Sequence, residues 1–305
     1  MRKLHYFLVD VFTDRAFGGN PLAVFTDGKG VPGEIMQSIA KEFNLSETTF
    51  VLPPKDVRNN YRVRIFTPTV ELPMAGHRTI GTTYVLARER MFKQSHSGMT
   101  TIRLEEGVGT IPVRIEWKDG TPAFIEMSQP LPAFGLRFED VETIAQVLSL
   151  EAEAITAPGL PMEVVSCGVP FLFVALRDLE AVRSIRLRLD VWERVLKNSK
   201  AANVFVFTKE TEVEASTVHS RMFAPASGIL EDPATGGASG PLGSYLVRHK
   251  VFPGRLEFVS EQGLEMGRPS FIKIRIEQDA EGQISGVHVG GQCHFMGSGH
   301  LEIDC

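Results

Sequence analysis

The sequence has 305 residues, 43% of them hydrophobic and 23% charged, a composition that is typical of a folded globular protein. The formal net charge of −5 and the lack of a dense Lys/Arg cluster argue against a nucleic-acid partner. No apolar run approaches the roughly 20 residues of a membrane-spanning helix, and the early Asp10 and Asp14 indicate a first strand rather than a signal peptide. We therefore expect a cytoplasmic protein that binds neither a membrane nor a nucleic acid.

The first half of the chain, residues 1–128, is predicted to be rich in strands. Alternating apolar residues predict the strands, and apolar residues at helical spacing predict the first helix. The second helix is predicted from the Gly loop that precedes it. The predicted strands span residues 4–12, 20–25, 61–66, 101–104, 110–117 and 121–127. Residues 44–52 are predicted to be a short loop that leads into a further strand. The predicted helices span residues 32–43 and 77–89. A C-terminal strand at about 290–305 is expected to return to this half.

The second half, residues 129–289, is predicted to open with a proline-bearing connector at 130–138. The predicted helices span residues 141–148 and 191–199, and a third follows the loop at 231–237. The predicted strands span residues 162–166, 171–176, 202–207, 216–223, 256–260, 271–276, 286–290 and 294–303. Strand-rich halves, each with one central helix, indicate an α+β fold.

Two motifs occur once in each half. The pattern R-x-F-x-P stands at 64–68 and 221–225, and E-x-P-x-x-G stands at 71–76 and 231–236. Because the motifs keep their order, the chain is predicted to contain a duplicated domain. The fold is then two pseudo-symmetric halves, each a curled mixed sheet around a central helix. Ligand sites favour such domain interfaces, so we expect the active site in the cleft between the halves.

Each repeat ends in glycine at the start of a helix, Gly76 in the first half and Gly236 with Gly237 in the second. A helix start presents free backbone N–H groups and the positive end of the helix dipole. Such a start can bind an anionic group. A small molecule that carries a carboxylate is therefore the expected partner.

Glu47 is the strongest candidate for a catalytic group. It stands at a loop-to-strand junction between the apolar residues Leu45 and Phe50. Apolar surface can raise the pKa of a carboxylate towards neutrality, as a general acid and base requires. The alternative is an ordinary loop glutamate exposed to solvent. The repeat aligns Glu47 with Ala202, so the fold itself does not require a carboxylate there, and this difference favours a function.

His77 and Asp232 are the next candidates. His77 stands at a helix start, where the dipole disfavours protonation of the imidazole, although it could simply bond to its own loop. Asp232 corresponds to Leu72 in the first half, whereas its neighbour Glu231 recurs as Glu71. Asp232 is therefore interpreted as functional and Glu231 as structural, with two solvated loop acids as the alternative.

Other reactive residue types give weaker signals. The spacing of His288, His294 and His300 could suggest a metal site, but glycines interrupt this segment, and no metal site is expected. The cysteines are odd in number and widely spaced, which argues against a disulfide framework. Cys167 is interpreted as a small buried hydrophobic residue.

These motifs resemble the PhzF-like phenazine-biosynthesis isomerase family. The matching segments keep the family's order over nearly the whole chain, at 19–24, 46–48, 71–77, 231–236 and 267–270. The resemblance implies a diaminopimelate-epimerase-like fold, a homodimer, and neither cofactor nor metal. It implies Glu47 as the general acid/base and places His77 and Asp232 in the substrate site. The candidates for substrate binding are Asn20, Ser46, Gly76, Thr235, Gly236 and Gly237.

The chain also departs from related sequences. The two catalytic cysteines of related epimerases would fall at Ala75 and Thr235, so epimerisation by two cysteines is excluded. Gly237 stands where the family commonly has serine. Arg78 stands where small apolar residues are common, and one interpretation is that it points outwards.

The resemblance implies a cofactor-independent isomerase that moves a hydrogen between carbons of a small carboxylate-bearing substrate. Two alternatives stay open at this point. One is a lyase or dehydratase on the same scaffold, and the other is a catalytically silent protein that binds a small acid.

Overall fold

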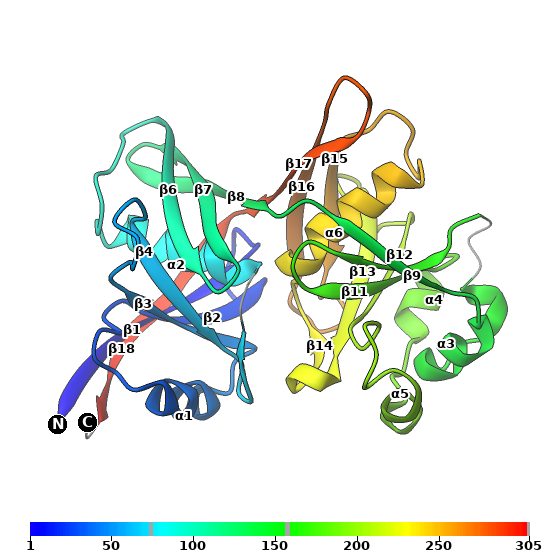
Figure 1. The fold of residues 1–305 in the computed structure, drawn as a ribbon, viewed down its shortest axis with the longest axis horizontal. Helices are drawn as coiled ribbons and strands as arrows, with labels where there is room; N and C mark the ends of the chain where they lie inside the picture. The colour runs from blue at the N-terminus through cyan, green and yellow to red at the C-terminus, as the bar shows by residue number, and fades with distance from the viewer. Residues whose placement is uncertain (73–75, 156–158, 304–305) are drawn as a thin grey trace. The chain divides into compact units, whose positions relative to one another are not determined.

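The computed structural model describes residues 1–72, 76–155 and 159–303 (Figure 1). The chain divides into two compact units, residues 1–128 with 289–305 and residues 129–288. It leaves the first unit within strand β8 (Thr121–Gln129) and returns within β17 (Ile284–Gly291). The fold is α+β, as predicted, with curled mixed sheets and few helices. Among the described residues, no helix is long and apolar enough to cross a membrane.

The first unit contains one mixed arrangement of strands around helix α2 (His77–Arg88). Its strands are β1 (Arg2–Val11), β2 (Asn20–Phe25), β3 (Glu47–Leu52), β4 (Tyr61–Phe66), β5 (Glu71–Leu72), β6 (Gly98–Glu106), β7 (Gly109–Lys118), β8 and, from the C-terminal end, β18 (Cys293–Ile303). The β2–β3 and β4–β6 pairs are parallel. The other pairs, β1–β18, β1–β2, β3–β4, β4–β5, β6–β7 and β7–β8, are antiparallel.

Helix α2 is buried on nearly every side, because its small residues let the strands approach closely. A Cβ atom built on Gly81 would lie 2.6 Å from side-chain carbons of both Leu22 and Val11. The second helix, α1 (Gly33–Phe43), is amphipathic and covers a core of stacked aromatic rings, in which Phe25 and Phe50 lie 4.8 Å apart. The first unit therefore has a packed core on which a polar site can be held rigidly.

The second unit repeats this strand pattern. Its strands are β9 (Ala133–Phe138), β10 (Met162–Ser166), β11 (Pro170–Ala175), β12 (Val204–Thr208), β13 (Val218–Ala224), β14 (Ile229–Asp232), β15 (Glu257–Gln262), β16 (Ser270–Gln278) and β17. Its α-helices are α3 (Val141–Leu148), α4 (Leu179–Ser184), α5 (Leu189–Val195) and α6 (Gly236–Arg248). The β11–β12 and β13–β15 pairs are parallel, and they correspond to the parallel pairs β2–β3 and β4–β6 of the first unit. This shared order agrees with the predicted duplication.

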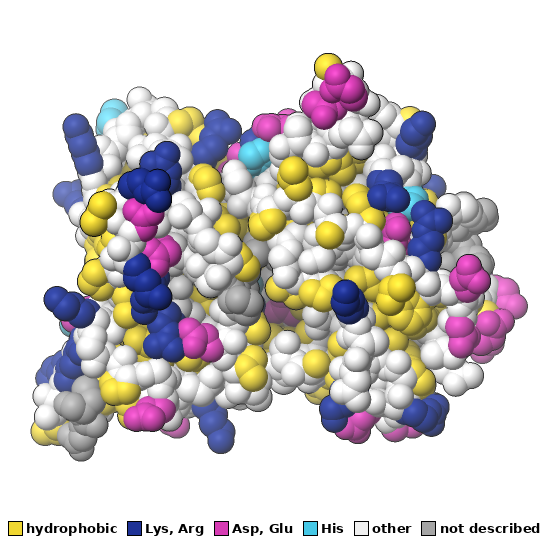
Figure 2. All heavy atoms as spheres, in the orientation of Figure 1, with side chains coloured by type: hydrophobic (Ala, Val, Ile, Leu, Met, Phe, Trp, Pro, Cys, Tyr) yellow, Lys and Arg dark blue, Asp and Glu magenta, His cyan; other side chains and the backbone are white. Residues whose placement is uncertain are grey.

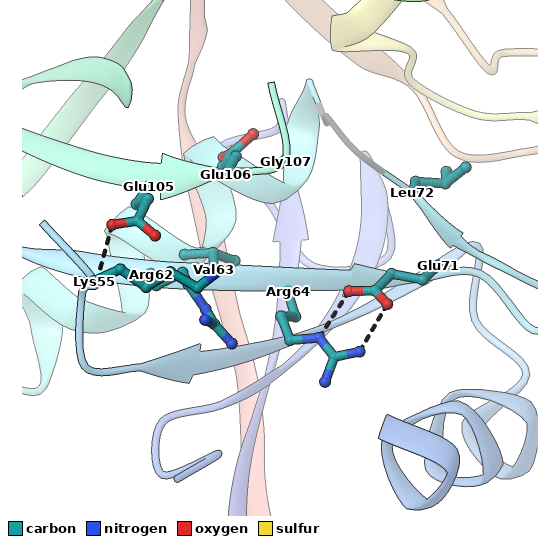
Figure 3. A pocket seen from close by; sticks show the side chains of 9 residues that line it. All are labelled: Lys55, Arg62, Val63, Arg64, Glu71, Leu72, Glu105, Glu106 and Gly107. Carbon is teal, nitrogen blue, oxygen red and sulfur yellow. Dashed lines mark hydrogen bonds and ion pairs between the residues drawn. The ribbon is translucent and has the colours of Figure 1, made fainter. Parts of the chain in front are cut away.

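The repeated motif forms the same ion pair in each unit. Arg64 donates from Nε and Nη2 to the carboxylate of Glu71, both at 2.7 Å (Figure 3). Arg221 donates to Glu231 in the same two-point manner, both at 2.8 Å. In both units the guanidinium carbon lies 5.1 Å from the ring centre of the motif's phenylalanine. The two-point pairing in both copies supports a structural role for Glu231.

The second unit differs from the prediction in three places. Residues 130–138 are not only a connector, because β9 pairs with β10 from Ala133 onwards. Its prolines precede the strand, where they remove no ladder hydrogen bond. Helix α4 was not predicted; it is short, and Asp178 begins it by accepting a hydrogen bond from the Ala181 N–H at 2.8 Å. The predicted helix at 191–199 begins earlier and ends at Val195.

On the face of the molecule shown in Figure 2, basic and acidic side chains of the described residues are interspersed. Lys and Arg side chains form a row down the left part of this view, with acidic side chains between them.

Candidate active site

Glu47 opens strand β3 and is 2% exposed. In the parallel β2–β3 pair it stands beside Leu22, and Ser46 precedes it in a half-buried position at the strand entrance. A carboxylate this deeply buried requires partners, because an isolated buried charge is very costly. The partners come from the start of helix α2.

Both oxygens of Glu47 face a nitrogen of helix α2. His77 Nε2 lies 2.6 Å from Glu47 Oε2, and Arg78 Nη2 donates to Glu47 Oε1. The other ring nitrogen, His77 Nδ1, lies 3.3 Å from Nδ2 of the buried Asn20. With the Asn20 amide donating to Nδ1, a neutral His77 carries its proton on Nε2, towards Glu47. The order Asn20, His77, Glu47 is thus a continuous chain of polar contacts.

The start of α2 is unusually positive for a helix N-terminus. Gly76 precedes it without a side-chain cap, and the first turn contains no acidic residue. Instead it carries Arg78, whose charge adds to the positive end of the dipole. Glu47 supplies the compensating negative charge from a neighbouring strand. The carboxylate therefore occupies an anion-binding position formed by the helix start and Arg78.

The contact of Arg78 corrects the interpretation that this side chain points outwards. Arg78 is buried and forms an ion pair with Glu47. Sequence reasoning noticed the unusual charge, but it could not tell which side of the helix start faces β3. The neighbouring Thr79 donates to Glu106 at 2.5 Å, which ties the same turn to strand β6.

The repeat supplies an internal comparison for this cluster. Thr48 pairs with Phe66 in the first unit, and Val204 pairs with Phe223 in the second. The two phenylalanines are equivalent in the repeat, so the counterpart of Glu47 is Asn203. The sequence alignment had suggested Ala202, which is one position away.

Asn203 donates from Nδ2 to the Pro170 carbonyl at 3.1 Å and carries no charge. At the helix start, Gly237 and Ala238 take the places of His77 and Arg78. Among the described residues, the buried cluster of Glu47, His77 and Arg78 therefore has no counterpart in the second unit, and the repeated architecture is built without it there.

The predicted residues of the second unit form a separate network. Asp232 is buried at the end of β14 and accepts a hydrogen bond from Thr235 Oγ1 at 2.6 Å. Gln262, which sequence reasoning missed, donates to the Asp232 carbonyl at 2.6 Å and accepts from the Thr235 N–H at 3.1 Å. This network fixes the loop that enters α6 at Gly236. The close approach of this loop to Gly263 adds support, since a Cβ there would lie 2.5 Å from the Pro233 carbonyl oxygen.

The remaining candidates are placed as follows. Cys167 is buried, and burial raises the pKa of its thiol to about 12, which agrees with an unreactive core residue. Within the described ranges, no three His, Cys, Asp or Glu side chains group in a way that could hold a metal ion. Ala75, one of the two positions compared with epimerase cysteines, lies outside the described residues.

Comparison with known proteins places these features in a family. Residues 9–299 match the family described as "phenazine biosynthesis-like protein". The trans-2,3-dihydro-3-hydroxyanthranilate isomerase of Pseudomonas chlororaphis is 36% identical, over 98% of this chain and 99% of that protein. An uncharacterized isomerase of Mesorhizobium japonicum is also 36% identical, over 99% of this chain and 100% of that protein.

A solved structure shows the same fold. The crystal structure of a PhzF-family phenazine biosynthesis protein from Bacillus anthracis has a TM-score of 0.88 at 28% identity, and the match covers 99% of this chain and 100% of that one. The chain therefore belongs to the phenazine biosynthesis-like family and is an enzyme of the isomerase class.

Proposed function

We propose that this isomerase moves a hydrogen between two carbons of a small carboxylate-bearing substrate without a cofactor, and that Glu47 is its general acid and base. The observation that carries the proposal is the buried cluster of Glu47, His77 and Arg78, which has no counterpart in the part of the second unit that the structure describes. Buried ion pairs often contribute little net stability. A charged cluster that the repeated fold does without is therefore better explained by chemistry than by folding.

In the proposed reaction, Glu47 in its ionised form takes a proton from one substrate carbon. The carbon–hydrogen electron pair moves into the conjugated system of the substrate, and the protonated Glu47 returns the proton to another carbon on the same face. His77 holds and orients the carboxylate through Nε2, and Asn20 orients His77 in turn. Atoms balance, because substrate and product differ only in the position of a hydrogen and a double bond.

Arg78 has a second role in this proposal. Each oxygen of Glu47 faces a nitrogen of helix α2, whereas a base needs a lone pair directed at carbon. A substrate carboxylate is an equivalent partner for a guanidinium group, so it can replace Glu47 at Arg78. Binding of the acidic substrate then frees one oxygen of Glu47 for proton transfer, and a substrate without a carboxylate does not.

The proposal also keeps the other predicted residues. Substrate contacts are assigned to Asp232 and to the binding candidates Asn20, Ser46, Gly76, Thr235, Gly236 and Gly237. We further propose, from the family resemblance, that the enzyme is a cytoplasmic homodimer. The first compound to assay is trans-2,3-dihydro-3-hydroxyanthranilate, which a relative's name gives as its substrate.

The central test is Glu47→Gln, which keeps the size of the side chain but cannot accept a proton from carbon. General acid–base catalysis is worth roughly 100- to 10,000-fold, so turnover and deuterium uptake from heavy water should fall at least about 100-fold. Glu42→Gln, an exposed change on α1, is the matched control and should behave like the wild type. If Glu47→Gln exchanges deuterium at the wild-type rate while Asp232→Asn does not, Asp232 is the base instead. Release of water or ammonia by the wild type would identify a lyase.

Arg78→Met tests the exchange of partners. The variant keeps an unbranched side chain of similar length without the charge, and KM for the carboxylate substrate should rise about tenfold or more. Binding of the corresponding uncharged amide should stay unchanged. A rise in kcat with KM unchanged would mean that Arg78 restrains Glu47 and does not bind substrate.

A further inference from the structure

A cavity in the first unit has a lining that contains none of Glu47, His77 and Arg78. It has a volume of about 490 Å³ and opens beside β4 and the β6–β7 turn (Figure 3). Its charged lining residues are Lys55, Arg62, Arg64, Glu71, Glu105 and Glu106. Arg62 and Arg64 are two residues apart in β4, so their guanidinium groups lie on the same side of the strand, as Figure 3 shows.

The three carboxylates of this cavity already have donors. Glu71 pairs with Arg64, and Glu106 accepts from Thr79. Glu105 Oε2 accepts from the backbone N–H groups of residues 55 and 56, both at 3.0 Å. Arg62 is different: among the described residues, its Nε is buried and has no hydrogen-bond partner. A buried donor without an acceptor is costly and requires an explanation.

The second unit shows how an equivalent site is completed. In the β4–β6 pair Arg62 stands opposite Glu105, and in the equivalent β13–β15 pair His219 stands opposite Glu261. Glu261 accepts from two successive backbone N–H groups, at residues 212 and 213, just as Glu105 does at 55 and 56. His219 is therefore the structural counterpart of Arg62.

The two units differ in one carboxylate. His219 Nε2 lies 2.8 Å from Glu265, and the charge of Arg221, the counterpart of Arg64, also acts on that carboxylate. Glu265 belongs to the turn at 263–269 that joins β15 to β16. In the first unit, Gly107 and Val108 alone join β6 to β7, and neither carries a carboxylate. Gly107 lines the cavity at this place.

We propose that this cavity binds the carboxylate group of a small molecule, which contacts Arg62 as Glu265 contacts His219 in the second unit, with Arg64 adding a second positive charge nearby. Arg62 gains the acceptor it lacks, and Lys55 adds positive charge at the edge. The cavity volume suits a small organic acid. One wall of the cavity is Glu106, which is hydrogen-bonded to the first turn of α2, so the bound acid contacts a group that holds the catalytic helix.

The test is calorimetric titration with succinate, with inorganic phosphate as the comparison anion. Succinate should bind the wild type, and Arg62→Gln should weaken that binding about tenfold or more, the worth of a charge-assisted hydrogen bond. Arg58→Gln is the matched control, because Arg58 lies outside the cavity in an exposed pair with Asp56, and it should bind succinate normally. Arg62→Lys keeps the charge without the planar fork and should give an intermediate affinity.

Equal succinate affinity in the wild type and Arg62→Gln would overturn the proposal, because the acid would then bind elsewhere. Failure to saturate the wild type at about 10 mM succinate would also overturn it. Tighter binding of phosphate than of succinate would contradict the carboxylate assignment. Since the measurement is binding and not turnover, it can fail while the catalytic proposal holds, and the reverse is also true.

Discussion

The buried cluster of His219, Glu261 and Glu265 predicts a definite pH dependence of stability. Burial lowers the pKa of His219, but hydrogen bonds to the two carboxylates outweigh burial and raise it from 6.5 to about 9. The difference of about 2.5 pKa units corresponds to about 3 kcal/mol of unfolding free energy. The folded-state value lies above the unfolded one, so this stability is fully present below pH 6.5 and is lost as the pH rises through 9.

The two carboxylates act in the opposite direction. Burial raises the pKa of Glu261 and Glu265, but the bonds to His219 and neighbouring donors outweigh it and leave both values below 4.5. Their contribution is present above pH 4.5 and is lost as the pH falls. The cluster therefore stabilises the second unit most between about pH 5 and 6.5.

The assay is urea unfolding followed by the fluorescence of Trp192, in a Trp117→Phe background that leaves one tryptophan, located in the second unit. The unfolding free energy of the wild type should fall by about 3 kcal/mol between pH 6 and pH 10 because of this cluster. His219→Gln removes the titrating group, so its unfolding free energy should lack this loss while being lower at pH 6. Equal losses in both proteins over this interval would refute the argument.

Three further predictions concern single positions. Gly81→Ala places a methyl group against Leu22 and Val11, so overpacking of roughly 1–3 kcal/mol should exceed the gain in helix propensity and lower Tm in thermal unfolding. Cys167 should stay unmodified by iodoacetamide at pH 8 in the native protein and react once unfolded, as checked by peptide mass mapping. Gly237→Ser should change relative activity across a panel of cyclic and acyclic amino and hydroxy acids while Tm stays the same; an unchanged profile would remove any role for this position in specificity.

The sequence predicted the long elements well and the short ones poorly. Strand β4 and helices α2 and α3 fall within a residue of their predicted bounds. Strand β4 and helix α3 carry an apolar period, and the Gly-rich loop marks the start of α2. The short strands β5 and β14 carry too few residues to show a period. Both are formed by tertiary contacts, chiefly the repeated Arg–Glu pairs, and not by local preference.

For the candidate site, the repeat was more informative than any single motif. It indicated Glu47 and Asp232 as functional, because the other half of the chain has no acidic residue at either equivalent position. It also misaligned Glu47 by one position, because short matches cannot fix a register that pairing with Phe66 and Phe223 determines. The contact of Arg78 with Glu47 depends on how α2 is rotated against β3, and apolar periodicity does not reveal this in a helix that is buried on all sides.

The pairing of β1 with β18 has a consequence for how the protein is made. A ribosome synthesises β1 early, but its neighbour at 293–303 follows only after the whole second unit. The second unit is continuous, so it can complete its own contacts while the first unit still exposes one edge of β1. Unpaired edges promote association between chains. The strand that closes this edge is therefore synthesised only after the second unit, and nascent chains are most exposed to misassembly until it arrives.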